Sequence, residues 1–390
     1  MTTLTSPVYT IPKTVDNTLL QILQWPRPHG SLAEELFCNW LSLKIRQAAG
    51  KAPDVLAEGC LYVTVPCPDK SASKVLFSCH VDTVDNPEDG HLVNEQPKLK
   101  QLNYDPSFGL IGMEATSPGS CLGADDGVGI WLMLEMLRAG VPGGYIFHRG
   151  EERGGIGSNA VLMSRPETLK CYNVAVAFDR PNDSEVITHQ GGLECASAEM
   201  GKALAEQLNQ YGLDYAPSSK GNFTDTKVYR KVIPECLNLG VGYSRQHSRD
   251  ETQDYGLLVT LRAALLRVRW ETLPVKRDHL KPDYTAEPKR SYYPSQGFFG
   301  GFDGYEAKSH GYPTLGSHGK AKPKATYKKA KSGQTQYDIL RTNTIPELEE
   351  WLTYQPEEGA KSIAELLLEI GRLRSDARIL KSLAGVDHAP

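Results

Sequence analysis

Hydrophobic positions in residues 1–273 alternate between short apolar runs and longer stretches with helical spacing. The short runs predict strands at residues 74–79, 144–147, 174–178 and 236–241. The longer stretches predict helices at residues 31–50, 126–140, 195–211 and 252–270. The run 74–79 is apolar on both faces, which is typical of a strand in the buried centre of a parallel sheet. Strands that alternate with helices predict an α/β fold, a three-layer α/β/α sandwich with a mostly parallel central sheet.

Local signals add further elements to this outline. Ser31 is followed three positions later by Glu34, the pattern of a capping box, so a helix is expected to begin there. The sequence Asp105-Pro106-Ser107 predicts the turn of a hairpin within residues 96–113. A further strand is expected at residues 54–65, and shorter helices at residues 15–23, 158–163 and 226–231.

The pattern changes after residue 273. Residues 274–340 are rich in Lys, Gly, Pro and Tyr and have no hydrophobic period, which predicts a basic, flexible linker. Aromatic residues interleaved with charge leave open a contact with nucleic acid or protein, with residues 318–331 as the candidate stretch. Residues 341–390 return to helical spacing and predict a small helical hairpin. Such an extension could dock on the body, on a second copy of the chain or on another protein.

Composition limits the classes of function. Hydrophobic residues make up 40% of the 390 positions, enough for a core, and the net charge of -4 gives no general reason to expect nucleic acid. No run approaches the roughly 18 apolar residues of a membrane span, and no signal peptide is evident, so a cytoplasmic protein without a membrane partner is expected. The 8 cysteines are scattered, which is typical of reduced thiols.

Chemically active side chains gather where predicted strands end or helices begin. His80 and Asp82 follow the strand at 74–79 and are expected to point the same way, so that the Asp82 carboxylate accepts a hydrogen bond from the imidazole. Similar positions at other predicted strand ends and helix starts carry Asp125 and Asp126, Glu151 and Glu152, Asp179, and His247. Open α/β sheets bind ligands at the carboxyl edge, so these groups are expected to meet there.

Each of these groups also has a simpler explanation. Glu151 and Glu152 could be solvated on a surface turn, and Asp126 could only cap a helix. Considered together, two imidazoles with several carboxylates and no thiolate suit divalent ions such as zinc, cobalt or manganese. Neighbouring glutamates at a strand end can do different work, one binding a cation and the other holding a proton.

At these positions the sequence resembles the co-catalytic zinc exopeptidases, which include zinc aminopeptidases, tripeptidases, carboxypeptidases and related deacylases. The resemblance covers about residues 30–272 and rests on the five stretches named above. It implies two divalent metal ions, most simply zinc, with cobalt and manganese as alternatives. By position, His80 and Asp179 would hold one ion and Glu152 and His247 the other. The remaining roles would fall to Asp125 as the bridge, through a cis peptide to Asp126, to Glu151 as general base and acid, and to Asp82 as the partner of His80.

The resemblance does not select one branch of that family. Only about forty residues separate Asp179 from Gly221, too few for an inserted sheet domain. Residues 1–273 are therefore expected to form a metallopeptidase catalytic domain without a lid. A lid would supply a histidine that donates to the oxyanion, and Tyr243 or a backbone N–H is suggested in its place.

These observations favour an aminopeptidase that acts on small peptides. Three alternatives stay open at this stage. The first keeps the chemistry and changes the substrate, giving a deacylase or another amidohydrolase. The second is a carboxypeptidase. The third is a catalytically idle peptidase fold that serves as a binding or structural protein.

Overall fold

The computed structural model describes residues 11–93 and 96–281. The predicted helical hairpin at 341–390, the stretch 318–331 and most of the predicted linker lie outside the described residues. The beginning of that linker is attached to the body, because the backbone N–H groups of Lys276 and Arg277 both donate to the Glu235 carboxylate, at 2.7 and 2.8 Å.

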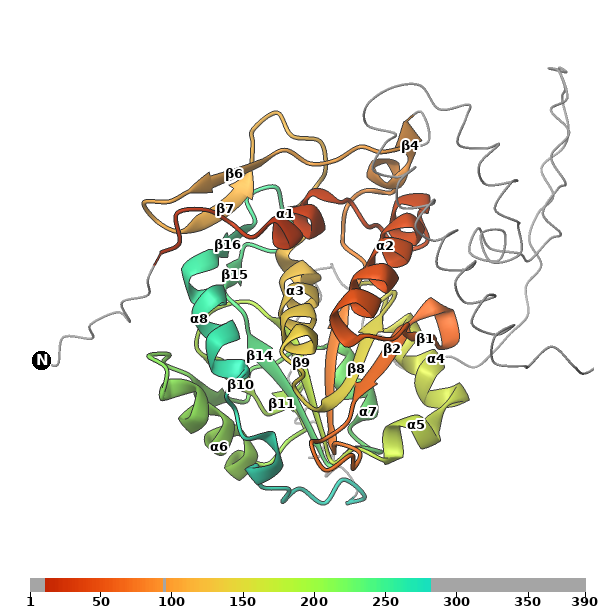
Figure 1. The fold of residues 1–390 in the computed structure, drawn as a ribbon, viewed down its shortest axis with the longest axis vertical. Coiled ribbons are helices and arrows are strands. Elements are labelled where there is room, and N and C mark those ends of the chain that lie inside the picture. Colours follow the sequence, from red (N-terminus) through yellow and green to blue (C-terminus); the bar gives the residue numbers. More distant parts are fainter. Residues whose placement is uncertain (1–10, 94–95, 282–390) are drawn as a thin grey trace, which may run out of the picture. The chain divides into compact units, whose positions relative to one another are not determined.

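An eight-stranded sheet forms the centre of the fold, in the order β1-β2-β8-β3-β9-β14-β10-β13 (Figure 1). Its strands are β1 (Asp54–Val55), β2 (Leu61–Val65), β3 (Val75–His80), β8 (Gly143–His148), β9 (Val174–Arg180), β10 (Glu185–Ile187), β13 (Ala216–Ser218) and β14 (Glu235–Gly240). The four central strands β8, β3, β9 and β14 are parallel, whereas β2 and β10 run antiparallel to their central neighbours. The α/β fold is confirmed, and the sheet is mixed at its flanks.

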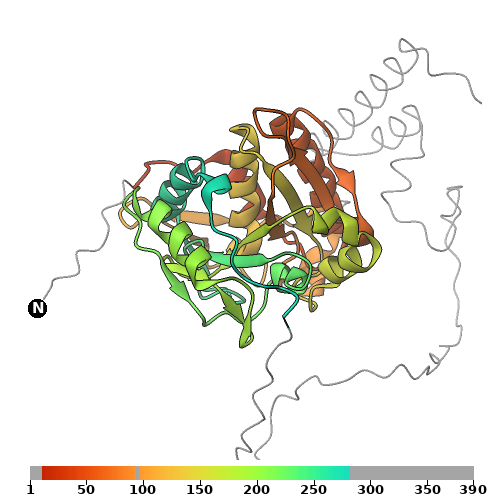
Figure 2. The same cartoon turned by 90° about the horizontal axis from the view of Figure 1, so that it is seen from below.

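Helices cover both faces of this sheet, as the view from below shows (Figure 2). One face carries α1 (Asn17–Gln24), α2 (Leu32–Ala49), α3 (Ala124–Arg138), α6 (Ala198–Asn209) and α8 (Tyr255–Leu265). The other carries α4 (Ile156–Ser164), α5 (Pro166–Lys170) and α7 (Asp225–Tyr229). The alternation of β3 explains the two cores, since Val75 and Phe77 join the first face and Leu76 joins the second. The three predicted layers are therefore present.

A smaller sheet of four strands, in the order β15-β16-β7-β6, accompanies the main one. It consists of β6 (Leu102–Asp105), β7 (Leu110–Met113), β15 (Tyr243–Ser244) and β16 (Thr252–Asp254). The hairpin of β6 and β7 was predicted. Two short hairpins also occur, β4 (Leu92–Val93) with β5 (Gln96–Pro97) and β11 (His189–Gln190) with β12 (Leu193–Glu194).

Several predicted boundaries are wrong, each for a local reason. The last helix does not begin at Thr252, because Asp254 caps it by accepting the Leu257 N–H at 2.9 Å, and residues 252–254 pair as a strand. The predicted strand 54–65 is broken by the 3₁₀ helix η1 (Ala57–Gly59) into β1 and β2. Further 3₁₀ turns are η2 (Pro87–Gly90) and η3 (Trp270–Thr272).

The helix cap at Ser31 is partly as expected. The Ser31 hydroxyl accepts the Glu34 N–H at 3.1 Å, but the Glu34 carboxylate accepts the N–H of Gly30, at 2.7 Å. None of the helices in residues 11–93 and 96–281 combines the length and apolar character that crossing a bilayer requires. All eight cysteines are free, as the sequence predicted.

Phe77 lies in the larger core, and its substitution measures how much this core contributes to stability. Its ring is fully buried and contacts Tyr145, Phe178 and Trp270, with centroid distances of 5.0, 6.1 and 4.8 Å. We expect Phe77→Ala to lower the free energy of unfolding by about 3–5 kcal/mol in urea titrations, because it removes these contacts and leaves a cavity. Phe108→Ala, at a position that is 70% exposed, is the control and should change it by less than about 0.5 kcal/mol.

Candidate metal centre

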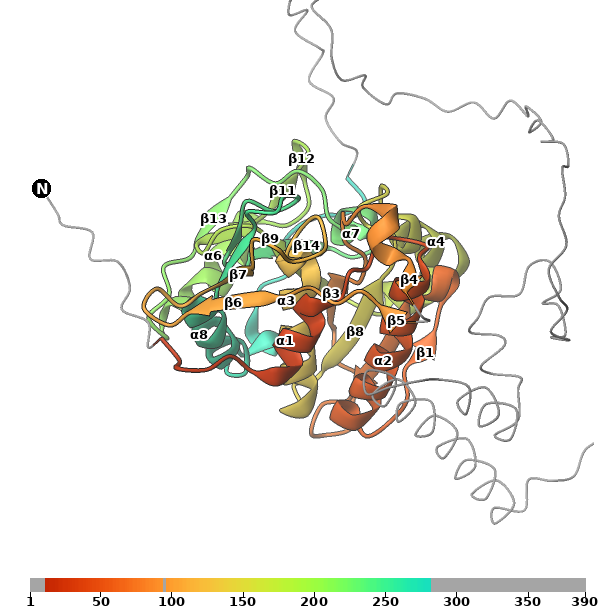
Figure 3. The same cartoon turned by 90° about the horizontal axis from the view of Figure 1, so that it is seen from above.

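The predicted site residues meet at one edge of the main sheet. His80 ends β3, Asp179 lies near the end of β9, and Glu151 and Glu152 lie in the turn that follows β8. Because these strands are parallel, their carboxyl ends lie side by side, as Figure 3 shows from above. Asp125 lies at the start of α3, and the loop between β15 and β16 carries the remaining histidine, His247.

Asp125 stands between two groups of donors. Its Oδ1 atom lies 3.0 Å from His80 Nε2, which is also 3.7 Å from Asp179 Oδ1. Its Oδ2 atom lies 3.3 Å from His247 Nε2, which is also 3.0 Å from Glu152 Oε1. The donor atoms of each group lie within 4.8 Å of one another. The structure thus brings together two sets of three donors that share one carboxylate, a geometry able to hold two cations.

The charge of the site fits positive ions. Asp125, Glu151 and Asp179 are all buried, and a buried carboxylate is costly unless a partner or a cation compensates it. The Glu152 Oε1 atom is buried and lies 3.0 Å from His247 Nε2. Oxygen and imidazole donors without thiolate are the set that zinc, manganese and cobalt accept.

Proton affinities in the site reflect this excess of negative charge. Hydrogen bonds with Asp125 and Glu152 raise the pKa of His247 to about 10. Burial and the neighbouring Asp179 carboxylate raise the pKa of Glu151 to about 11. Both groups therefore hold protons strongly, and a divalent ion would compete with the proton of His247 for the same electron pair.

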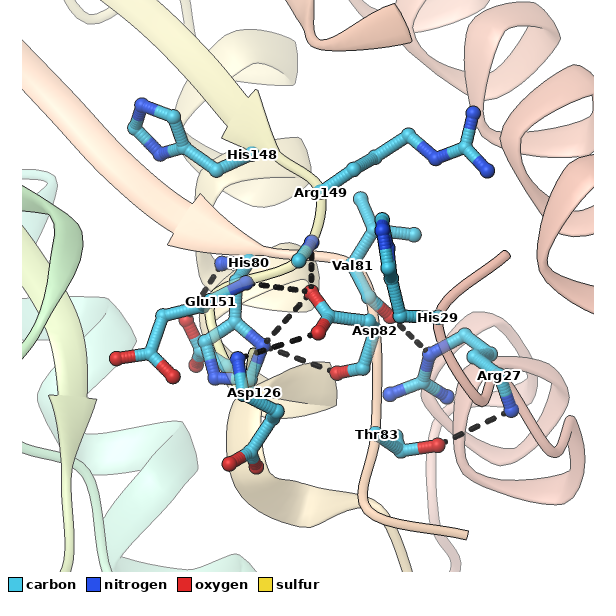
Figure 4. A network of polar contacts seen from close by, with 12 residues as sticks. Arg27, His29, His80, Val81, Asp82, Thr83, Asp126, His148, Arg149 and Glu151 are labelled. Carbon is cyan, nitrogen blue, oxygen red and sulfur yellow. Dashed lines mark hydrogen bonds and ion pairs between the residues drawn. The ribbon is translucent and has the colours of Figure 1, made fainter. Parts of the chain in front are cut away.

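Asp82 does not pair with His80 as predicted. The His80 Nδ1–H group donates to the backbone carbonyl of Asp82 at 2.9 Å, while the Asp82 carboxylate is 3.7 Å away, too far for a hydrogen bond. That carboxylate instead accepts the backbone N–H groups of Gly150, Glu151 and Glu152, at 2.7, 3.1 and 3.2 Å (Figure 4). The prediction used strand alternation, but β3 ends at His80. Asp82 thus shapes the turn that carries both glutamates.

Asp126 connects α3 to β3. Its peptide bond with Asp125 is cis, as the resemblance implied. The Asp126 carboxylate accepts the N–H of Gly129 and the N–H of His80, both at 3.1 Å. The expected helix cap is therefore present, and the same side chain also binds the end of the neighbouring strand.

Tyr243 lies against a metal-ligand candidate rather than open to substrate. Its hydroxyl donates to Asp179 Oδ1 at 3.1 Å, and its side chain is only 1% exposed. The suggestion that this hydroxyl serves an oxyanion is therefore wrong. Asn238, on the neighbouring strand β14, holds the same aspartate by accepting its backbone N–H at 3.0 Å.

A buried polar chain behind the site was missed in the sequence. His148 ends β8; its Nδ1 lies 3.2 Å from Asp225 and its Nε2 lies 2.6 Å from the Tyr229 hydroxyl. Burial lowers the pKa of His148 to about 3, so the imidazole is neutral and shares a hydrogen bond with the Tyr229 hydroxyl through Nε2. This chain fastens α7 to the sheet. A lone aspartate before a short helix gives no sequence signal for it.

No protein-family model and no curated protein matches the chain, but solved structures resemble it. An aminopeptidase PepT from Bacillus cereus aligns with a TM-score of 0.51 at 15% identity. A tripeptidase from Staphylococcus aureus aligns with a TM-score of 0.52 at 16% identity. Each alignment covers 64% of this chain and 95% of the other. The chain has the fold of these two peptidases. This agrees with the fold that the resemblance to co-catalytic zinc exopeptidases implied.

The role of Asp82 can be measured directly. Asp82→Asn replaces one carboxylate oxygen with an amide that cannot accept, so we expect amide exchange at Gly150, Glu151 and Glu152 to accelerate about tenfold or more, in line with ~1–3 kcal/mol for an unsatisfied group. Asp105→Asn, which also removes a carboxylate that accepts a backbone N–H (from Ser107, at 2.8 Å), should leave these amides unchanged. Unchanged protection in Asp82→Asn would refute the role.

Proposed function

We propose that the protein is a metal-dependent exopeptidase, an aminopeptidase that hydrolyses small peptides with two divalent ions, zinc first among them. The observation that carries this proposal is the sharing of Asp125 between two sets of donors, with His80 on one side and His247 on the other. A solvated acidic turn or a helix cap does not explain two imidazoles converging on one carboxylate. The likeness in fold to an aminopeptidase and a tripeptidase supports the choice of peptide substrates.

The donors divide naturally between the ions. His80 and Asp179 would hold one ion, Glu152 and His247 the other, and Asp125 would give one oxygen to each. Two metal ions bound in this way lower the pKa of a water molecule and polarise the carbonyl group of the scissile bond.

Glu151 has the position and the chemistry of the general base. Its carboxylate lies within 4.8 Å of donor atoms of both His80 and Glu152, and the residue is 9% exposed. Burial favours its neutral form and nearby positive charge would favour the carboxylate, so the group can take a proton from water and return it to the leaving amine. Asp82 holds this glutamate in place through its backbone N–H, at 3.1 Å.

The location that suits this proposal is the cytoplasm. All eight cysteines are free, and five of them are buried, which fits a reducing compartment.

Exchanging each of the two neighbouring glutamates separates their roles. Glu151→Gln should lower kcat about 10²–10⁴-fold on a panel of free-amine peptides while two zinc ions still bind by calorimetry. Glu152→Gln should weaken the binding of one ion as well as turnover. Glu114→Gln, at an exposed position, is the control and should behave like the wild type. A chelator should abolish activity, and zinc, manganese or cobalt should restore it.

Three outcomes would contradict the proposal in different ways. Intact turnover in Glu151→Gln would mean that another group is the base. Hydrolysis of N-acyl amino acids, with none of free-amine peptides, would show a deacylase. Failure of the full-length chain to bind zinc, manganese or cobalt would show an idle fold.

A further inference from the structure

The loop that carries Asp125 is held from both sides by buried charged side chains. Glu251, which is 1% exposed, accepts the N–H of Gly123 at 2.8 Å with one carboxylate oxygen and the N–H of Asp125 at 2.9 Å with the other. Arg27, which is fully buried, donates from Nη2 to the Gly123 carbonyl at 3.1 Å. One side chain thus binds the donors of the loop and the other binds its acceptor.

Arg27 also reaches the segment that carries the first histidine. Its Nε–H group donates to the carbonyl of Val81, between His80 and Asp82, at 2.6 Å (Figure 4). Its Nη1 group donates to the carbonyls of Ile22 and Trp25, at 2.6 and 3.1 Å. The guanidinium therefore ties together the two chain segments that supply His80 and Asp125, from the side away from the ion sites.

Burying these charges is costly, and simple packing does not require it. A buried ion costs several kcal/mol unless it is compensated, and a neutral side chain of similar size would fill the same space. The compensation is local: Asp85 and Glu251 act on Arg27 electrostatically, and the Phe37 ring lies 4.9 Å from its guanidinium carbon. Each charge is used to orient backbone groups beside the donors.

The loop is closely packed around Gly123. Gly123 has a positive φ of 78°. A Cβ atom at this position would lie 3.1 Å from the Thr83 methyl group and 3.3 Å from Lys100 Nζ. The Lys100 ammonium is itself held by Asp85, at 2.7 Å. The loop is therefore enclosed by side chains whose positions are set by their own partners.

We propose that Arg27 and Glu251 are positioning residues that set the orientation of the bridging Asp125 relative to His80, and so the spacing of the two ion sites. This rests on the proposed function, since it takes Asp125 as the shared ligand. Neither residue supplies a donor atom to the two groups that would hold the ions. Losing either contact would let the peptide groups of Gly123 and Asp125 turn, and one carboxylate could then no longer serve both ions.

The chain supplies a matched control for Glu251. Glu235, at the opposite end of the sheet, is also fully buried and also accepts backbone N–H groups, from Ser197 at 2.6 Å and from Lys276 at 2.7 Å. Glu251→Gln and Glu235→Gln therefore remove the same kind of interaction, one beside the ion sites and one remote from them. Both are made in the full-length chain and depleted of metal.

Cobalt titration followed by calorimetry and visible absorption gives the main readout. We expect Glu251→Gln to weaken the binding of the two cobalt ions about 10–100-fold, the usual effect of removing a residue that orients a metal ligand. The substitution should also alter the cobalt spectrum. Glu235→Gln should lower the Tm about as much as Glu251→Gln does, but its cobalt affinity and its cobalt spectrum should match those of the wild type. Wild-type affinity and spectrum in Glu251→Gln would overturn the proposal.

Two further measurements cover the remaining outcomes. If Glu251→Gln does not fold, Arg27→Lys takes its place. The lysine keeps the positive charge but cannot reach both the Val81 and Gly123 carbonyls, so this variant should also weaken cobalt binding. Wild-type cobalt affinity in Arg27→Lys would overturn the proposal. If the wild type binds no cobalt, the proposed function fails, and amide exchange decides the present inference. Amide exchange at Gly123 should then be faster in Glu251→Gln, or in Arg27→Lys where Glu251→Gln does not fold, and unchanged in the control Glu235→Gln. Unchanged exchange in the test variant would refute the positioning role.

Discussion

Repulsion among carboxylates is the constraint on which this structure depends. Asp125, Glu151, Glu152 and Asp179 converge at the carboxyl edge of the central strands, where water is largely excluded. Such a group of like charges is stable only if protons or cations neutralise it. The pKa of His247 is raised to about 10 and that of Glu151 to about 11, so these surroundings favour the protonated form of both groups. The same physical demand makes the site suitable for divalent ions.

A second theme is the use of acidic side chains to hold backbone N–H groups near the site. Asp82 binds the turn of the glutamates, Asp126 binds the start of α3 and the end of β3, and Glu251 binds the loop of Asp125. Each contact is short, buried and directed at a peptide group beside a candidate ligand. The candidate ligands are thus positioned through the backbone, which moves less than a side chain does.

Much of this arrangement could be predicted from the sequence. Apolar runs gave the central strands, and a parallel sheet implies that the residues after those strands meet at one edge. The features that could not be predicted depend on the path that the chain takes after a strand or helix ends. Asp82 was placed by strand alternation, which no longer applies after His80, and Tyr243 was placed in a loop without knowing that its hydroxyl faces Asp179. Arg27 and Glu251 give no local pattern, because their partners are backbone groups far away in the sequence.

The order of the donors along the chain has a consequence for biosynthesis. The shared carboxylate at Asp125 is made early, whereas His247 and the supporting Glu251 come from the end of the folded body. A nascent chain that ends before these two residues therefore carries four of the five candidate donors and lacks His247. The second group of donors, which includes His247, is therefore complete only after this late segment has left the ribosome.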